Sequence, residues 1–270
     1  MKKQTVIALF AFVGLLNLDT ASGQSIARYT LNAAETPPGN SGDEMDGPSL
    51  SIYGGAAVTA GNFAKEGGTT FPSWVNAIRN GSSGSAPGFP GSGCARAGFT
   101  AGIQIETGGS LGWLVSAAYA KNNVSHNPPW QEPTSGGSTM GVTITSDSWT
   151  SLNISTGMKL ELMRVPGFRL QVAPLIGAFF AKSPNLQVDI SESGTTETVR
   201  LSSTSGKALS YGGQVDCTIA GIVLVGARYF YSTPTYDVPY SVVTGLSAVN
   251  GTETHKQSTS LILVYLGFSI

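Results

Sequence analysis

Residues 97–106 read Ala-Gly-Phe-Thr-Ala-Gly-Ile-Gln-Ile-Glu, and their side chains alternate between two kinds along the whole stretch. Small and apolar residues occupy the odd positions, and glycine or polar residues occupy the even ones. In a β-strand successive side chains point to opposite faces, whereas a helix would scatter each set around its circumference. The stretch therefore predicts a strand with one apolar face and one polar face.

The same period of two recurs along the chain, most clearly over residues 152–162. Pro174 falls on the apolar face of one such segment, and because proline has no N–H to donate, we expect a bulge or weakened pairing there. Extending the period predicts an all-β chain with eight strands near residues 49–60, 97–107, 110–121, 148–162, 167–181, 207–219, 221–231 and 258–270.

Short and long connections alternate between these strands. Apolar alternation at residues 186–190 and 199–201 predicts that the third long connection continues as a hairpin beyond the barrel. Short turns on one rim and long loops on the other are typical of an antiparallel up-and-down transmembrane barrel, with extracellular loops and both termini in the periplasm. The tight turns are at 107–110, 164–167 and 219–221, and the long segments at about 61–96, 122–147, 182–206 and 232–257.

Composition and the first residues indicate a secreted chain. Charged residues make up only 11% of it, against about 25% in soluble proteins, so a soluble surface would be hard to build. Residues 1–23 combine two lysines, an apolar run and small residues before Gln24, which predicts a signal peptide. The apolar run is shorter than the roughly 20 residues of a membrane-spanning helix. Residues 24–48 predict a flexible periplasmic segment, and residues 49–270 a single barrel domain.

The aromatic residues indicate which face meets lipid, because a soluble calyx such as a lipocalin turns its apolar face inward. On the apolar faces the rings gather at the two ends of the strands, with aliphatic residues between them. Amphipathic rings favour the depth of lipid headgroups, so the pattern predicts two belts in the outer membrane of a Gram-negative cell. The belt residues are Phe99, Tyr119, Phe180, Tyr211, Tyr229 and Tyr231 at the loop end and Trp113, Phe168 and Phe268 at the turn end.

The opposite faces then line the interior. Since an eight-stranded barrel is just wide enough for side chains to fill it, these polar groups predict a paired, hydrogen-bonded plug and not a conduit. An acid/base function for its carboxylates would need a cleft that is reachable from outside. The predicted interior network consists of Gln104, Glu106, Lys159, Glu161, Arg169, Gln171, Gln214, Asp216 and Arg228.

Three stretches carry a resemblance to a known family: residues 172–177 (Val-Ala-Pro-Leu-Ile-Gly), residues 212–216 (Gly-Gly-Gln-Val-Asp) and the last strand, 262–270. With the amphipathic strands, they make residues 49–270 resemble the small OmpA/OmpX-type outer-membrane barrels, especially the barrel-domain proteins of the Bacteroidota. The resemblance implies insertion by the barrel-assembly machinery, which reads a last strand usually ending in an aromatic residue, whereas this chain ends in Ile270. It implies no single activity, because such barrels serve as anchors, adhesins, small channels and, in a few cases, enzymes.

Few residues suggest a reaction chemistry. His126 and His255 belong to no recognisable metal or nucleophile spacing, and we expect no cofactor or metal. Ser125 next to His126 is superficially similar to the Ser and His of the lipid A deacylase barrels. Cys94 and Cys217 fall at opposite ends of the barrel and predict free thiols. A net charge of -1 without any basic run excludes nucleic acid as a partner.

The leading hypothesis is a non-enzymatic surface anchor or envelope component, surrounded by outer-membrane lipid, whose long loops bind an extracellular or envelope partner. The alternative is a narrow passive pore. A third option is an enzyme that acts on lipid or peptide, which would require His126 or His255. The loop rings either bind a partner or pack on one another to order the loops; they are Phe71, Trp74, Phe89, Trp130, Tyr236 and Tyr240.

Overall fold

The computed structural model describes residues 47–64, 95–124, 130–133, 139–192 and 194–270. The chain divides into two units, Met1–Glu44 and Met45–Ile270, and the described residues belong to the second. The predicted signal peptide and most of the periplasmic segment therefore lie outside the described residues. Within them no helix is long and apolar enough to cross a membrane.

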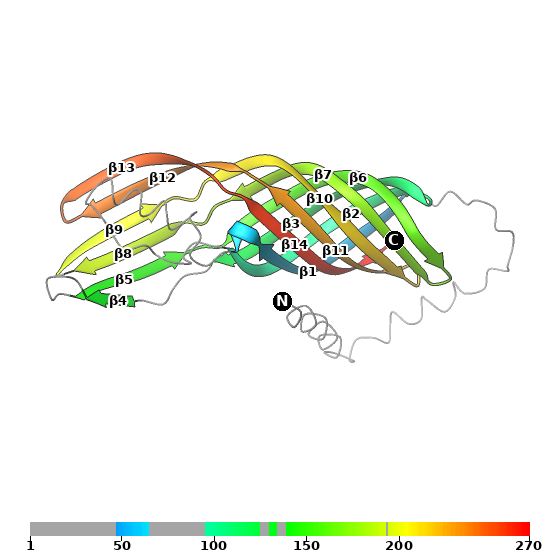
Figure 1. Ribbon diagram of the computed structural model, residues 1–270, viewed down its shortest axis with the longest axis horizontal. Coiled ribbons are helices and arrows are strands. Elements are labelled where there is room, and N and C mark those ends of the chain that lie inside the picture. The colour runs from blue at the N-terminus through cyan, green and yellow to red at the C-terminus, as the bar shows by residue number, and fades with distance from the viewer. Residues whose placement is uncertain (1–46, 65–94, 125–129, 134–138, 193) are drawn as a thin grey trace. The chain divides into compact units, whose positions relative to one another are not determined.

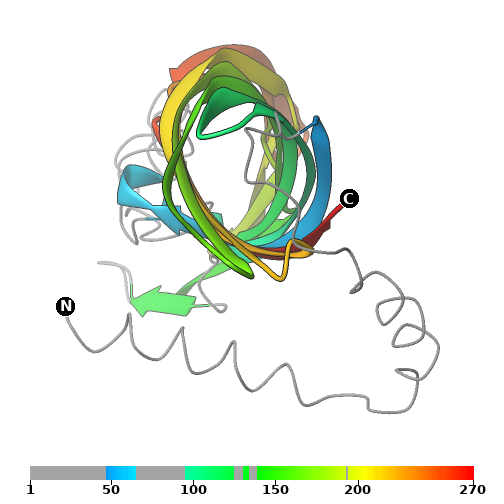
Figure 2. The ribbon, with the colours of Figure 1, turned by 90° about the vertical axis from the view of Figure 1, so that its right-hand side faces the viewer.

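Eight strands close into a barrel, and each is antiparallel to its two neighbours. Chain neighbours lie side by side around the wall, and β1 pairs with β14 to close the ring, as Figure 2 shows in a view along the barrel. The predicted eight-stranded antiparallel up-and-down barrel is confirmed. Its strands are β1 (Ser49–Ala60), β2 (Ala95–Gly108), β3 (Leu111–Val124), β6 (Trp149–Val165), β7 (Phe168–Lys182), β10 (Ser205–Ile219), β11 (Val223–Ser232) and β14 (Thr259–Ser269).

One rim of the barrel, called here the turn rim, carries the three tight turns that join β2 to β3, β6 to β7 and β10 to β11. Gly108, Gly167 and Gly221 have φ angles of 80°, 76° and 73° in these turns, a conformation that only glycine adopts without strain. Ile270 exchanges two backbone hydrogen bonds with Leu50, so the start of β1 and the end of β14 meet at the same rim.

Pro174 interrupts the pairing of β6 with β7, as expected for a residue without an N–H. The ladder pairs Gly157 with Leu175 and resumes at Leu160 with Val172, and no pair forms between them. Proline thus occupies an outward position on a central strand at the cost of a local gap in the ladder.

Six further strands extend the wall beyond the opposite rim, called here the loop rim (Figure 1). They form one sheet in the order β13-β12-β9-β8-β5-β4, which we call the extension, and it joins the barrel where Thr235 pairs with Lys207 of β10. Its strands are β4 (Trp130–Pro133), β5 (Thr139–Ser146), β8 (Leu186–Glu192), β9 (Thr195–Leu201), β12 (Thr235–Thr244) and β13 (Ser247–Lys256).

The hairpin of β8 and β9 agrees with the alternation of apolar residues in the third long connection. The sequence analysis did not predict the strands within two other long connections: 122–147 contains β4 and β5, and 232–257 contains β12 and β13. Tyr236, Val238 and Val242 do alternate along β12 and are buried. Pro239 and the uniformly polar β13 obscured that pattern.

Candidate functional site

The interior of the barrel nearest the turn rim holds a charged layer. The Glu106 carboxylate of β2 forms ion pairs with the Lys159 ammonium of β6, at 3.2 Å, and with the Arg169 guanidinium of β7, at 3.9 Å. The Gln171 amide donates to the same carboxylate at 2.6 Å. Glu106 and Lys159 are each only 2% exposed, at the floor of a pocket of about 440 Å³ that opens at the turn rim. Glu106 and Lys159 are therefore paired and hydrogen-bonded, as a buried ion pair must be to persist.

Glu161 does not join this layer. Its carboxylate accepts two hydrogen bonds from Arg164, at 2.8 Å and 2.9 Å, on the turn rim. Its side chain is only 6% exposed, so Glu161 lies inside as predicted, but its partner is Arg164 and not the charged layer. A register shift between Glu161 and Met163 lies at this end of β6.

A second layer, midway along the barrel, is organised by one amide. Gln104 donates to Glu106 at 2.5 Å and to Asp216 at 2.9 Å, and its carbonyl oxygen accepts from Arg228 at 2.6 Å. Gln214 also donates to Gln104, at 2.9 Å, and to Asp216. Gln104, on β2, thus links the carboxylates of Glu106 and Asp216 to the guanidinium of Arg228. Asp216 and Arg228 lie on β10 and β11, across the barrel from β2.

Two tyrosines complete this layer, and the sequence reasoning missed them. Tyr53 of β1 accepts a hydrogen bond from Arg228 at 2.9 Å, and Tyr265 of β14 donates to Asp216 at 2.5 Å. The rings lie 4.4 Å apart, and the guanidinium lies 5.3 Å and 5.5 Å from their centroids. The predicted interior network included no residue of β1 or β14. Tyr265 could have been found, because it alternates with Val264 and Leu266 as an inward residue should.

Gly226 of β11 leaves the space that these groups occupy. A methyl group there would collide with the Asp216 carboxylate and the Tyr265 ring. Overpacking of a filled core costs about 1–3 kcal/mol, so Gly226→Ala should destabilise the barrel by that amount in urea unfolding. Gly109→Ala is the control, because nothing lies within 4 Å of its added methyl group. Equal stability of the two variants would contradict this packing.

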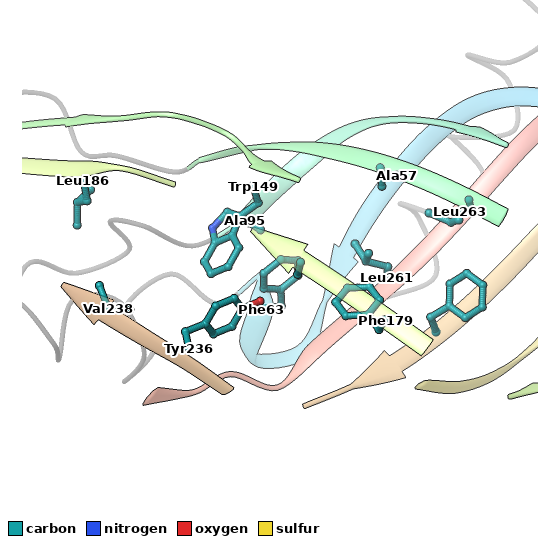
Figure 3. Close-up of a cluster of buried hydrophobic side chains, with 14 of the residues drawn as sticks. Ala57, Phe63, Ala95, Trp149, Phe179, Leu186, Tyr236, Val238, Leu261 and Leu263 are labelled. Atoms are coloured by element: carbon teal, nitrogen blue, oxygen red, sulfur yellow. The ribbon is translucent and has the colours of Figure 1, made fainter. Parts of the chain in front are cut away.

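Above the second layer the interior is mostly apolar, with a few buried polar side chains such as Asn122 and Asn153. The predicted interior network did not include these apolar residues. Phe63, Trp149 and Tyr236 meet near the loop rim, with ring centroids 5.2 Å apart for Phe63 and Trp149 and 5.8 Å apart for Trp149 and Tyr236 (Figure 3). The apolar cluster closes the end of the barrel from which the extension grows. Its members inside the barrel include Ala57, Phe179, Phe230, Leu261 and Leu263, all nearly inaccessible to solvent.

A barrel filled by these three layers should pass no steady current across a planar bilayer. Large apolar side chains fill the interior near the loop rim, and the charged groups below them are already paired with one another. Single-channel recording on the refolded full chain measures this. Unitary steps that change when Glu106, Lys159 or Arg228 is substituted would show that the interior conducts.

The outer face of the barrel wall is apolar. Seven of the nine predicted belt residues are exposed, and the other two, Phe168 and Tyr231, are partly buried. Between them lie exposed aliphatic residues such as Ile103, Ile154 and Ile176. The exposed rings are Phe99, Trp113, Tyr119, Phe180, Tyr211, Tyr229 and Phe268.

No protein-family model matches the sequence, and no curated protein is significantly similar to it. Among solved structures, the attachment invasion locus protein Ail of Yersinia pestis in complex with the heparin analogue sucrose octasulfate is 14% identical, with a TM-score of 0.39 over 83% of this chain and 99% of that one. A second structure of Ail is 15% identical, with a TM-score of 0.38 over 84% of this chain and 100% of that one. LpxR from Salmonella typhimurium is 13% identical, with a TM-score of 0.18 over 82% of this chain and 99% of its own. None of these matches bears on the resemblance to the Bacteroidota proteins.

The residues considered for catalysis do not form a site in the described part of the chain. His255 lies on β13, where burial lowers its pKa to about 4, so its imidazole is neutral at pH 7. Cys217 has a free thiol on the barrel wall. Within the described ranges no group of three or more His, Cys, Asp or Glu could hold a metal ion. Ser125, His126 and Cys94 lie outside those ranges.

Of the six aromatic residues predicted in the long connections, the structure describes the side chains of two. Tyr236 is fully buried against Trp149, and Tyr240 packs on the same apolar cluster. These two therefore pack within the protein, Tyr236 fully and Tyr240 in part. Phe71, Trp74 and Phe89 lie outside the described residues, as does the side chain of Trp130.

The outward face of the extension carries a preordered polar array on β8 and β9. Asp189 accepts hydrogen bonds from Gln187 at 2.9 Å and 3.1 Å and from Thr198 at 2.7 Å. Arg200 donates to Gln187 at 3.2 Å. On the opposite face of the same two strands, Val188 and Val199 are buried. The sheet thus has an apolar face that anchors it and a polar face held in fixed geometry.

Proposed function

We propose that this chain is an outer-membrane protein whose filled barrel holds the extension outside the cell as a non-enzymatic binding surface. The observation that carries the proposal is the continuation of the barrel wall into a six-stranded sheet above an interior that is packed shut. A conduit would need a continuous passage, and the pocket that opens at the turn rim ends at Glu106 and Lys159, below layers filled by side chains. The polar array on β8 and β9, half-buried except for the exposed Arg200, offers hydrogen bonds with little ordering cost, which favours binding.

Contact with lipid would explain why the outer face of the barrel wall is apolar. Exposed aliphatic and aromatic side chains on all sides of a closed barrel suit a hydrocarbon environment, in which every backbone group must be paired internally. In this proposal the turn rim, with both ends of the barrel, lies in the periplasm, and the extension lies outside. The alternating β14 would serve as the signal that the barrel-assembly machinery reads during insertion.

Loop replacement tests the binding role. In one variant, short Gly-Ser turns replace residues 125–148, 183–204 and 233–258, and the barrel strands are kept. Cells that display the full chain should adhere to at least one of a panel of immobilised matrix proteins and polysaccharides, and cells that display the variant should not. A shift in gel mobility on heating shows that the variant barrel has folded.

A triple substitution separates the polar array from the fold of the extension. Gln187→Ala, Asp189→Ala and Arg200→Ala together remove the outward groups but leave the buried valines of β8 and β9 in place. The proposal expects adhesion to fall while folding persists. Full adhesion by the shortened barrel would refute the binding role of the extension.

A further inference from the structure

The lysines of the barrel wall gather at one level. Of the five lysines in the described residues, only Lys159 is buried. The other four are exposed where strands leave the loop rim, at the end of β3, the end of β7, the start of β10 and the end of β13. They are Lys121, Lys182, Lys207 and Lys256.

Two of these lysines line a pocket on the outside of the wall. Its volume is about 500 Å³, and it lies where β10 passes its pairing from the barrel to β12. Lys182 pairs with Ser205 and Lys207 with Phe180, so the two lysines are diagonal neighbours on adjacent strands. Diagonal side chains on one face start about 7–8 Å apart, so both ammonium groups can reach one anion between them.

The pocket is amphipathic in the direction of the barrel axis. Tyr119, Leu152 and Phe180 form its apolar side, toward the middle of the barrel, and all three are exposed. Lys182 follows Phe180 by two residues on the same face of β7, toward the loop rim. A ligand that fits has an anionic group next to apolar chains, in the order that a lipid presents them in the outer leaflet.

Within the described part of the chain, the ammonium groups of Lys182 and Lys207 form no hydrogen bond or ion pair, although both backbones are paired in the sheet. Thr150, Ser205 and Thr235 line the pocket and add hydroxyl donors. Asp237 is the single acidic residue of the lining, and it accepts a hydrogen bond from Thr254 at 2.6 Å. The lining therefore keeps a positive charge that an anion can neutralise.

We propose that this pocket binds the phosphate headgroup of a membrane lipid, with Lys182 and Lys207 on the phosphate and the acyl chains along Tyr119, Leu152 and Phe180. The proposal rests on the outer-membrane location proposed above. A headgroup bound here would fix the depth and rotation of the barrel beneath the extension. Basic residues near a membrane surface each contribute a modest, additive attraction to anionic lipids.

Native mass spectrometry of the full chain released from phosphatidylcholine nanodiscs measures the affinity. Phosphatidic acid is the probe, and phosphatidylcholine with the same acyl chains is the reference. The expected result is selective retention of phosphatidic acid. Replacement with glutamine should weaken binding about fivefold for each lysine and roughly 25-fold for Lys182→Gln with Lys207→Gln.

Three controls locate the site. The double substitution to arginine keeps the charge and should keep the binding. Lys256→Gln removes an equally exposed lysine that does not line the pocket, and should change the affinity about twofold or less. Asp237→Asn removes the opposing charge and should tighten binding. An effect of Lys256→Gln as large as that of the double substitution would mean a diffuse basic rim and would overturn the pocket.

Two further outcomes separate the possible sources of failure. Inorganic phosphate alone should not compete at the concentrations at which phosphatidic acid binds, and equal competition would overturn the lipid as ligand. If the barrel inserts into phosphatidylcholine bilayers but does not discriminate between the lipids, this inference fails and the proposed membrane location stands. If it does not insert at all, the location itself fails.

Discussion

Arg228→Ala is expected to destabilise the folded barrel by about 3–5 kcal/mol, the usual cost of removing one partner from a buried charged network. The Arg228 guanidinium donates to Tyr53 and Ser116 at 2.9 Å and 2.8 Å, in addition to Gln104. Its loss would leave the buried Asp216 carboxylate without a nearby cation. Three buried acceptors, on Tyr53, Ser116 and Gln104, would each also lose one donor.

Urea unfolding of the refolded chain in lipid vesicles, followed by the heat-dependent shift in gel mobility, measures this cost. Arg200→Ala is the matched control, because Arg200 is exposed on the extension and makes one side-chain hydrogen bond there. It should change stability by no more than about 0.5 kcal/mol. If the two arginine variants unfolded at the same urea concentration, the second interior layer would not be what stabilises the barrel.

Ile176→Arg should destabilise the barrel in a bilayer by about 2–4 kcal/mol, the cost of a cation on the lipid face near the membrane midplane. Ile176 is 59% exposed on β7 and lies between the belt residues Phe168 and Phe180. No acidic side chain pairs with its position, because its strand neighbours are Thr156 and Tyr211.

The same urea titration measures this effect, with two controls. Ile176→Leu keeps an apolar side chain and should cost little. Gln187→Arg places the same cation on the outward face of β8, beyond the loop rim, and should be close to neutral. A neutral Ile176→Arg in bilayers would show that the outer face of the wall does not contact lipid.

The alternation of side chains was sufficient to predict the eight barrel strands, their antiparallel order and the single tight-turn rim. These features depend on local sequence, because period two and turn glycines act within a few residues. The gap at Pro174 was predictable for the same reason. The interior residues Gln104, Glu106, Lys159, Asp216 and Arg228 could also be chosen, since parity along a strand fixes which residues point inward.

Which of these side chains meet could not be predicted, because contacts across a closed barrel depend on the stagger between strands. Gln104 bonds to Asp216, 112 residues away, and Arg228 reaches Tyr53 across 175 residues. Glu161 has the correct parity for the interior and a buried side chain, but its carboxylate bonds to Arg164 at the turn rim and not to the residues of the network. Parity alone does not give height in the barrel.

The extension was mostly missed, because one of its hairpins hides the usual signal. Nearly every residue of β13 is exposed, so that strand has no apolar face to reveal it. Its pairing partner β12 has alternating apolar residues, but Pro239 in the middle of that segment argued against a strand there. The wall lysines were visible in the sequence, each at the loop end of a strand, and their common level becomes apparent only once the registers are known.

Cysteine labelling on intact cells tests most directly whether the barrel crosses the outer membrane with the extension outside. In a chain with Cys94→Ser and Cys217→Ser, Leu246→Cys places a thiol at the fully exposed tip of the β12–β13 hairpin, and Gly109→Cys places one in the turn between β2 and β3. A membrane-impermeant maleimide should label the hairpin cysteine on intact cells and the turn cysteine only after the outer membrane is permeabilised. Equal labelling of both positions on intact cells, or labelling of the turn alone, would contradict the account.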